Sequence, residues 1–295
     1  MMRAGFVALV GRPNVGKSTL LNRLVGYRVA AIASKPQTTR NQIRGIVTQD
    51  DAQLVFVDTP GLHEDAKTLL NRSLNAAAVA ALEEVDVVAL LVEAGRFTAE
   101  DDYVLKRLKH LNKPLVLVIN KVDRLKSPNE VLGFIDSMQK RHDFAEIVPL
   151  SAQTGANCNE LVKTLKAYLP ESDLLFPEDQ ITDKSVRFIV GELIREQVMQ
   201  RLHQEIPYSV AVEVEEFDEQ ESLVRIGAVI WVERDGQKGI VIGKKGQMLK
   251  AIGSGARVAI EGFLEQKVYL RLWVKVSEDW QNDPRRWQQF GVDAP

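Results

Sequence analysis

The sequence contains very little cysteine. Cys158 is the single cysteine among 295 residues, so no disulfide can form within the chain. A chain without internal disulfides is typical of a reducing compartment, because small secreted domains usually depend on several. The segment from Met1 to Arg12 also lacks the layout of a cleaved signal peptide. We therefore expect a cytoplasmic protein.

Long apolar runs and a strong net charge are also missing. No segment approaches the roughly twenty consecutive apolar residues that a membrane-spanning helix needs. The formal net charge is -2, so nucleic acid could bind only at a local basic patch. Apolar residues make up 45% of the chain, which is ordinary for globular proteins, and the length is sufficient for two domains.

Short apolar runs alternate with helical stretches in the first part of the chain. The predicted strands are Phe6–Val10, Gln42–Thr48, Gln53–Val57, Val85–Val92, Pro114–Ile119 and Glu146–Leu150. The predicted helices include Lys17–Val25, Ala66–Glu84 and Ala99–His110. Strands that alternate with helices predict an α/β domain with a mostly parallel sheet and helices on both faces.

The pattern changes after residue 170. The segment from Pro170 to Lys184 holds two prolines and several acidic residues without clear periodicity, which indicates a linker at residues 171–184. Beyond it we expect helices Val186–Leu202 and Met248–Leu264 and strands Ser209–Val214, Leu223–Val232 and Val268–Val276. This is an α+β pattern. The predicted ranges are 1–170 and 185–280 for the two domains, 171–184 for the linker and 281–295 for a C-terminal tail.

A glycine-rich motif follows the first predicted strand and opens the first helix. Gly11-Arg12-Pro13-Asn14-Val15-Gly16-Lys17-Ser18 fits the phosphate-loop pattern G-x-x-x-x-G-K-[ST]. Glycines let backbone N–H groups approach phosphates closely, and the helix N-terminus adds partial positive charge. We expect Lys17 to reach the outer phosphates and the Ser18 hydroxyl to bind Mg²⁺.

Two further loops complete the predicted phosphate and metal site. Asp58-Thr59-Pro60-Gly61 ends the third strand, where the Asp58 carboxylate could hold a magnesium-bound water and the Gly61 N–H could sense a terminal phosphate. Thr39, in the polar segment before the second strand, could complete the magnesium shell in the triphosphate state. The alternatives are an ordinary turn and an exposed polar loop.

The motif Asn120-Lys121-Val122-Asp123 ends another strand and predicts the choice of base. The Asp123 carboxylate can accept two hydrogen bonds from the ring N–H and exocyclic amine of guanine, and adenine offers no such pair of donors. We expect Asn120 and Lys121 to brace the loop and pack against the base. The dipeptide Ser151-Ala152 could support the base through backbone N–H groups.

These motifs, in this order, resemble the translation-factor-related GTPases over residues 5–170. The resemblance implies GTP and GDP binding, hydrolysis of GTP with Mg²⁺, a catalytic set of Lys17, Thr39, Asp58 and Gly61, and metal ligands Ser18, Thr39 and Asp58. It implies nucleotide contacts from Gly11, Arg12, Pro13, Asn14, Val15, Gly16, Lys17, Ser18, Thr19, Asp58, Thr59, Pro60, Gly61, Leu62, Asn120, Lys121, Val122, Asp123, Ser151 and Ala152.

Leu62 departs from the Ras pattern, in which a glutamine orients the attacking water. The water must therefore be positioned by a backbone group, a partner or a cation near Asn14. Slow hydrolysis that K⁺ stimulates is one hypothesis.

The segment Val241–Ile252 resembles the V-I-G-x-x-G-x-x-I-K-x-I signature of KH domains. The resemblance implies that the glycine loop, flanked by a strand end and a helix, clamps about four nucleotides of single-stranded RNA. The element order looks like the type II KH arrangement. The RNA-binding residues that it implies are Ile242, Gly243, Lys244, Lys245, Gly246 and Lys250. The alternative for Lys244-Lys245 is an exposed turn.

Local charge favours the RNA interpretation. The segment from Arg234 to Arg257 carries six basic residues and one acidic residue, whereas the segment from Glu213 to Glu221 carries six acidic residues and no base. Such polarity orients a polyanion toward one side. The alternation of the last predicted strand also places aromatic and basic side chains on one face, where Trp273 could stack on a base or pack beneath a helix.

Nearly the whole chain resembles the Era family of bacterial GTPases, which join such a G domain to a type II KH domain. The shared motifs include G-R-P-N-V-G-K-S-T, Q-T-T-R, D-T-P-G-L-H, N-K-V-D, F-P-E-D-Q-I-T-D and V-I-G-K-K-G. The resemblance implies binding to the 3′ end of 16S ribosomal RNA, a role in maturation and assembly of the small (30S) ribosomal subunit, and peripheral association with the inner membrane. We expect a monomer. A metabolic P-loop kinase and a nucleotide-regulated protein scaffold are the competing interpretations.

Overall fold

The computed structural model describes residues 2–33, 35, 40–59, 68–202 and 206–292. It divides into two units. The first unit comprises Met1–Val29, Gln42–Asp65 and Asn75–Asp183, and the second comprises Ala30–Asn41, Ala66–Leu74 and Lys184–Pro295. Two short segments of the N-terminal half, Ala30–Asn41 and Ala66–Leu74, therefore belong with the C-terminal part of the chain. The predicted domain ranges stay predictions.

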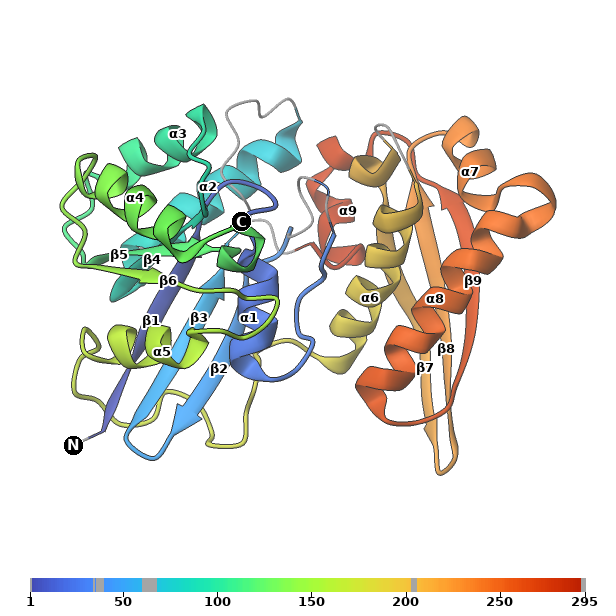
Figure 1. Ribbon diagram of the computed structural model, residues 1–295. Helices are drawn as coiled ribbons and strands as arrows, with labels where there is room; N and C mark the ends of the chain where they lie inside the picture. The colour runs from blue at the N-terminus through green and yellow to red at the C-terminus, as the bar shows by residue number, and fades with distance from the viewer. Residues whose placement is uncertain (1, 34, 36–39, 60–67, 203–205, 293–295) are drawn as a thin grey trace. The chain divides into compact units, whose positions relative to one another are not determined.

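A six-stranded sheet forms the centre of the first unit (Figure 1). Its strands are β1 (Arg3–Val10), β2 (Ile43–Gln49), β3 (Ala52–Asp58), β4 (Val87–Glu93), β5 (Leu115–Asn120) and β6 (Glu146–Pro149), in the order β2-β3-β1-β4-β5-β6. β2 pairs antiparallel with β3, and the other neighbours pair in parallel. The central strands are continuous apolar runs because helices cover both of their faces. The predicted fold class is confirmed.

Helices cover the first sheet on both sides (Figure 1). α3 (Ala99–Leu108), α4 (Pro128–Gln139) and the later turns of α2 (Leu69–Glu84) pack on one face with β1, β4 and β5. α1 (Lys17–Val25) and α5 (Cys158–Lys166) cover the other face. The 3₁₀ turn η1 (Val122–Arg124) follows β5. This arrangement brings the loops after β1, β3 and β5 to the same edge of the sheet, where ligands of α/β proteins bind.

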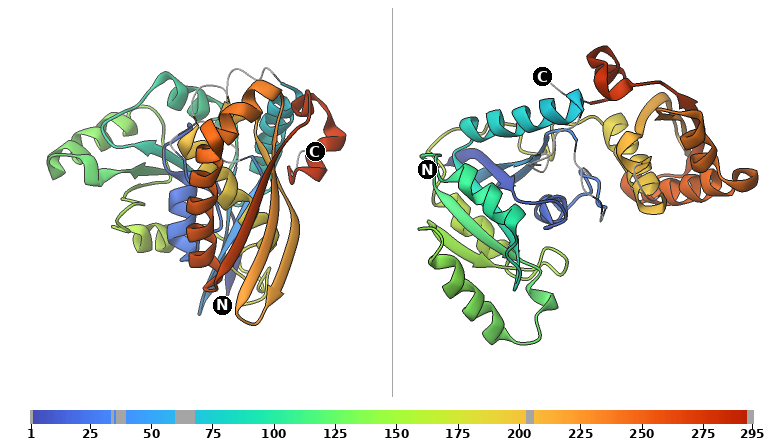
Figure 2. Two further views of the ribbon diagram at one scale, coloured as in Figure 1. Left: turned by 90° about the vertical axis from the view of Figure 1, so that its right-hand side faces the viewer. Right: turned by 90° about the horizontal axis from the view of Figure 1, so that it is seen from above.

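The second unit contains a three-stranded sheet in the order β7-β8-β9. Its main elements are α6 (Val186–Arg201), β7 (Ala211–Gln220), β8 (Leu223–Val232), α7 (Asp235–Ile242), α8 (Gln247–Leu264) and β9 (Val268–Val276). The helices α6 and α8 lie side by side on one face of the sheet and share an apolar core with it (Figure 2). Shorter elements are η2 (Ile206–Ser209), η3 (Lys244–Gly246), η4 (Trp280–Asn282) and α9 (Pro284–Gln289).

The structure corrects two local predictions. The strand predicted at Ser209–Val214 is β7, which runs from Ala211 to Gln220. The residues before the glycine loop, Val241 and Ile242, end the helix α7 and not a strand. The helix is difficult to predict from the sequence, because Gly236, Gly239 and β-branched residues have low helix propensity. Packing of the buried Val241 side chain in the second core outweighs that local preference.

The predicted linker forms neither helix nor strand between Glu171 and Lys184, apart from isolated bridges. The buried Gln53 side chain holds part of it, because its oxygen accepts from the backbone N–H groups of Leu175 and Phe176 at 2.8 and 2.9 Å. Among the helices that the structure describes, none has the length and apolar character to cross a bilayer.

Candidate functional site

The phosphate loop lies between β1 and α1, as its motif predicts. Gly16 has φ of 109°, and a β-carbon there would collide with Nδ2 of Asn120. The same Asn120 nitrogen donates to the Val15 carbonyl at 2.8 Å. A glycine is therefore required at position 16 for the phosphate loop to contact the N-K-x-D loop. This contact joins the predicted phosphate-binding and base-binding parts of the nucleotide site.

The Lys17 side chain is 7% exposed and is folded back over the loop. Its ammonium donates to the carbonyls of Gly11 and Arg12 at 2.8 and 3.1 Å. Burial lowers the pKa of Lys17, an effect that the nearby Asp58 carboxylate partly opposes. Burial deprives the Lys17 ammonium of water. The negative charge of a phosphate ligand would compensate for this lost hydration, so the site is suited to a phosphate.

Two of the predicted metal ligands lie together. The Ser18 hydroxyl donates to Oδ2 of Asp58 at 2.7 Å, and Asp58 is fully buried at the end of β3. Thr59 is anchored next to it through a hydrogen bond from its hydroxyl to the Leu9 carbonyl at 3.1 Å. A hydroxyl and a carboxylate are hard oxygen donors of the kind that Mg²⁺ prefers. Four further predicted residues lie outside the described part of the chain, namely Thr39, Pro60, Gly61 and Leu62.

The base loop is held by Asn120 and Lys121. The Asn120 side-chain oxygen accepts from the backbone N–H groups of Lys121 and Ala152 at 2.8 and 3.0 Å. The Lys121 ammonium donates to the Asn14 carbonyl of the phosphate loop at 2.8 Å. Asp123 is exposed, and its carboxylate has no hydrogen bond or ion pair with any described residue. The bracing role of Asn120 and Lys121 is therefore visible, while the Asp123 carboxylate is available to a ligand.

The backbone N–H groups of Ser151 and Ala152, which were predicted to support the base, donate to other residues of the protein. The Ala152 N–H is directed at Asn120, and the Ser151 N–H donates to the Ala156 carbonyl at 3.0 Å. The Ser151 hydroxyl accepts from the Thr154 N–H at 3.1 Å. These bonds stabilise the loop next to the base motif. A direct contact of either N–H with a base stays a prediction.

An ion-pair network beneath the nucleotide loops was not predicted. The Arg12 guanidinium contacts Glu93 at 2.7 Å and Asp101 at 3.1 Å, and Lys121 contacts the same Glu93 at 3.2 Å. Burial alone would raise the pKa of Glu93, but the hydrogen bonds from Arg12 and Lys121 outweigh it and lower that pKa. Asp101 is fully buried and also caps α3 together with Thr98. The Thr98-x-x-Asp101 capping pattern was the available sequence signal for part of this network.

The G-x-x-G loop connects α7 to α8 through η3. Gly243 has φ of 71°, and a β-carbon there would lie 2.6 Å from Cβ of Met248. Lys244 and Lys245 are both exposed, and Lys245 has φ of 51°. The loop thus presents two ammonium groups from a tight turn that requires glycine at its first position.

A groove of about 440 Å³ begins at this loop and runs between α8 and β9. It is lined by Gly246, Leu249, Lys250, Gly253, Ser254, Arg257, Leu270, Arg271 and Leu272. Its floor is apolar, and its charged lining residues Lys250, Arg257 and Arg271 are all basic. The predicted RNA-binding set included Gly246 and Lys250 of this lining. Arg257 and Arg271 entered the sequence analysis only through their charge, and Ser254 was missed. A groove with an apolar floor and a basic rim has the chemistry of a site for unstacked bases and phosphates.

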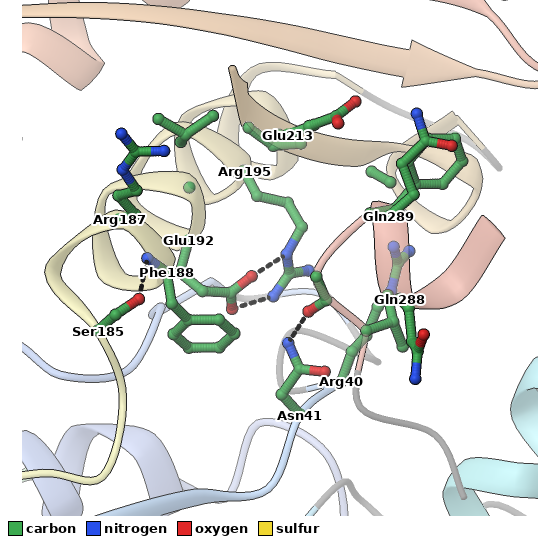
Figure 3. Close-up of a pocket in the computed structure, with 17 residues that line it drawn as sticks. Arg40, Asn41, Ser185, Arg187, Phe188, Glu192, Arg195, Glu213, Gln288 and Gln289 are labelled. Carbon is green, nitrogen blue, oxygen red and sulfur yellow. Dashed lines mark hydrogen bonds and ion pairs between the residues drawn. The ribbon is translucent and has the colours of Figure 1, made fainter. Parts of the chain in front are cut away.

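A second pocket of the second unit, of about 360 Å³, holds the residue that follows Thr39 (Figure 3). Arg40 is 2% exposed and donates to the Val210 carbonyl at 2.6 Å, with its guanidinium 5.6 Å from the Trp280 ring centre. Burial, together with the nearby Arg195, lowers the pKa of Arg40 to about 9. Arg195 itself makes a two-point ion pair with Glu192 (Figure 3). The residue after Thr39 is therefore anchored in the second unit.

Comparison with known proteins identifies a family for each part of the chain. The family described as a 50S ribosome-binding GTPase matches residues 6–121, and the KH domain family matches residues 205–281. The chain is 48% identical to GTPase Era of Marinobacter nauticus over 290 residues, which covers 98% of this chain and 95% of that protein. It is 47% identical to GTPase Era of Pseudomonas fluorescens, with 98% and 96% covered.

Two solved structures have the same fold over almost their full length. One is Era in complex with MgGDPNP and nucleotides 1506–1542 of 16S ribosomal RNA, with a TM-score of 0.93, 43% identity and 99% of both chains covered. The other is a variant of Aquifex aeolicus Era bound to GDP and tetrafluoroaluminate, with the same TM-score, identity and coverage.

The fold and its two sites define a P-loop GTPase joined to a KH domain. The nucleotide loops belong to the first domain, and the G-x-x-G loop with its groove belongs to the second. The chain belongs to the Era family of GTPases.

Proposed function

We propose that this GTPase binds the 3′ region of 16S ribosomal RNA through its KH domain and acts in maturation and assembly of the small ribosomal subunit. The observation that carries the proposal is the G-x-x-G loop with its basic groove, in a chain whose fold matches an Era bound to 16S RNA over 99% of its length. The GTPase domain would then make this RNA contact depend on the nucleotide.

The residues of the first domain would divide the work of hydrolysis. Lys17 would bind the outer phosphates, and backbone N–H groups of the loop would surround them. Ser18, Asp58 and Thr39 would hold Mg²⁺, which would neutralise charge that develops on the phosphate oxygens. Gly61 would sense the terminal phosphate through its N–H. The contact between the Ser18 hydroxyl and Asp58 supports this assignment, because it places two oxygen donors at one point.

Positioning of the attacking water is a separate proposal. A hydrophobic residue, Leu62, takes the place of the glutamine of Ras-like proteins. We propose that K⁺ near Asn14 contributes to this step. Turnover should then be faster in KCl than in NaCl at equal ionic strength, and equal rates in the two salts would exclude the cation.

The RNA proposal is tested by binding. The labelled RNA fragment would correspond to nucleotides 1506–1542 of 16S ribosomal RNA, the fragment seen with the related Era. The double variant Lys244→Gln/Lys245→Gln should bind it more weakly, and the slope of log affinity against log salt should fall by about one for each lost phosphate contact. Absence of binding by the unaltered protein would instead favour a protein scaffold.

We also propose a cytoplasmic monomer with peripheral membrane association. A single, buried cysteine supports a reducing compartment. The membrane association rests on the family resemblance alone. Sedimentation of the purified protein and fractionation of cells before and after a high-salt wash would test these statements.

A further inference from the structure

The sheet of the KH domain has a second face, opposite to the helices. Along β9 the side chains of Val268, Leu270, Leu272 and Val274 join the helix-covered core. Residues of the other parity point away from that core, because side chains alternate along a strand. Tyr269, Arg271 and Trp273 therefore lie on the opposite face, which decides between the two alternatives for Trp273: it does not pack beneath α6 or α8.

Trp273 lies against β8 at a glycine. A β-carbon built on Gly227 would come within 2.9 Å of Oε2 of Glu216 and 3.1 Å of the Trp273 ring, so the absence of a side chain leaves room for both the carboxylate of β7 and the indole. Trp273 is half-buried, whereas Tyr269 is 49% exposed. Two aromatic rings thus stand on the same face of one strand, four residues apart, with Arg271 between them.

Two arginines flank these rings without a carboxylate partner. Arg225 is the cross-strand neighbour of Tyr269, and Arg271 lies with its guanidinium 5.6 Å from the Trp273 ring centre. Both arginines are exposed, and neither forms an ion pair with any residue that the structure describes. Asp218 is opposite Arg225 in the pairing of β7 with β8, but its carboxylate accepts from Gln220 at 2.9 Å.

The neighbouring charges limit the extent of this surface. Lys275 continues the same parity but is paired with Glu215 at 2.9 Å, and Glu213 accepts from the Trp231 indole at 2.9 Å. The acidic strand β7 therefore repels a polyanion from one side. Arg225, Tyr269, Arg271 and Trp273 form what we call the β9 face.

The β9 face is continuous with the RNA groove. β9 is an edge strand of its sheet. Arg271 lines the groove between α8 and β9 and also flanks Trp273. A nucleotide strand that leaves the groove across this edge would meet Arg271 first and then the two aromatic rings.

We propose that the β9 face is a second contact surface for the single-stranded RNA held in the groove. Bases outside the G-x-x-G clamp stack on Tyr269 and Trp273, while Arg225 and Arg271 pair with the adjoining phosphates. Exposed aromatic rings beside unpaired arginines are the combination that binds single strands without strict sequence preference. The inference rests on the proposed RNA binding and extends its footprint beyond the about four nucleotides of the clamp.

The test compares nested truncations of the RNA fragment 1506–1542, with the full chain throughout. The unaltered protein should lose affinity when nucleotides next to the shortest tightly bound core are removed or made abasic. Tyr269→Ala should lose about five- to hundredfold in affinity for the longer RNA, the range for one stacked base. Its affinity for the core should stay the same, and Tyr269→Phe should restore the longer contact.

Two further variants separate charge from stacking. Arg225→Gln should reduce the salt dependence for the longer RNA and leave that for the core unchanged. Arg286→Gln is the matched control, because Arg286 is an exposed arginine of α9 in the same unit. It should change neither value.

Three outcomes would contradict the proposal that the β9 face contacts RNA. They are no affinity gain beyond the core in the unaltered protein, an undiminished gain in Tyr269→Ala, or an equal loss by Tyr269→Ala for core and longer RNA. Failure of the unaltered protein to bind any of these RNAs would instead remove the proposed function itself.

Discussion

Glu93 is the residue on which the two nucleotide loops converge. It accepts from Arg12 of the phosphate loop and from Lys121 of the base loop, and its side chain is 17% exposed. The Lys121 ammonium also reaches the Asn14 carbonyl. Arg124 approaches the same carboxylate at 3.5 Å. Because a carboxylate held by several cationic partners keeps a fixed geometry, we expect Glu93 to position Lys121.

Replacement of Glu93→Gln should weaken GTP and GDP binding equally, by about tenfold, because charge-assisted hydrogen bonds to Arg12 and Lys121 are lost. The turnover rate at saturating GTP should not change, since Lys17 and Asp58 are unaffected. Fluorescent nucleotide titration and steady-state hydrolysis measure the two values. Glu100→Gln, an exposed glutamate of α3, is the control. A lower turnover rate with unchanged affinity would assign Glu93 to another role.

Asp123 is the single residue that we expect to select guanine over other bases. Asp123→Asn should lower GTP affinity by about a hundredfold, because two charge-assisted hydrogen bonds from guanine are lost. It should gain affinity for xanthosine triphosphate, whose ring offers an oxygen where guanine has its amine. Competition between GTP, ATP and xanthosine triphosphate measures this change, with Asp136→Asn on α4 as the exposed control. Unaltered selectivity between GTP and ATP would refute the assignment of Asp123.

At the scale of an element, the turn between α7 and α8 depends on one glycine. Gly243 has φ of 71° and faces Cβ of Met248. Gly262, by contrast, lies inside α8 with open space around its α-carbon. The two positions therefore form a matched pair in the same domain.

Gly243→Ala should lower RNA affinity by at least about tenfold, because strain of this kind moves the lysines away from the phosphates. Basal GTP hydrolysis should remain, since the nucleotide loops belong to the other unit. Gly262→Ala should leave RNA binding intact and raise the melting temperature slightly, because alanine is the better helix former. RNA titration and thermal unfolding check both variants. Equal RNA affinity of Gly243→Ala and the unaltered protein would exclude the proposed clamp.

The elements also show what the sequence could predict. β9 begins and ends at the predicted Val268 and Val276, because strict alternation is a strong local signal. α7 could not be predicted, since its two glycines and β-branched end are stabilised only by the core that the whole unit forms. The Glu93 network joins residues far apart in the chain, so local patterns indicate only the Thr98–Asp101 cap within it. Motif residues such as Lys17 and Asn120 were predictable, because each lies at a fixed position in a short motif that follows a strand.

At the scale of the whole molecule, the segment Ala30–Asn41 is where we expect the two functions to be coupled. The chain before and after it belongs to the first unit, whereas the segment itself belongs to the second. Within it, the Ile32 N–H donates to Glu196 at 2.9 Å and Arg40 is buried beside Trp280. Thr39, the predicted metal ligand, is adjacent to Arg40. We therefore expect that a nucleotide that orders Thr39 would act on a segment that belongs to the second unit.

Such a connection produces regulation only if the two nucleotide states differ in RNA affinity, because coupling between sites is reciprocal and requires a differential interaction. The most direct test is anisotropy titration of the labelled 1506–1542 RNA fragment, with the protein saturated by a non-hydrolysable GTP analogue or by GDP. We expect tighter binding in the GTP-analogue state, by about five- to hundredfold for a typical coupling free energy. Equal affinity in the two states would contradict a nucleotide switch that controls RNA binding.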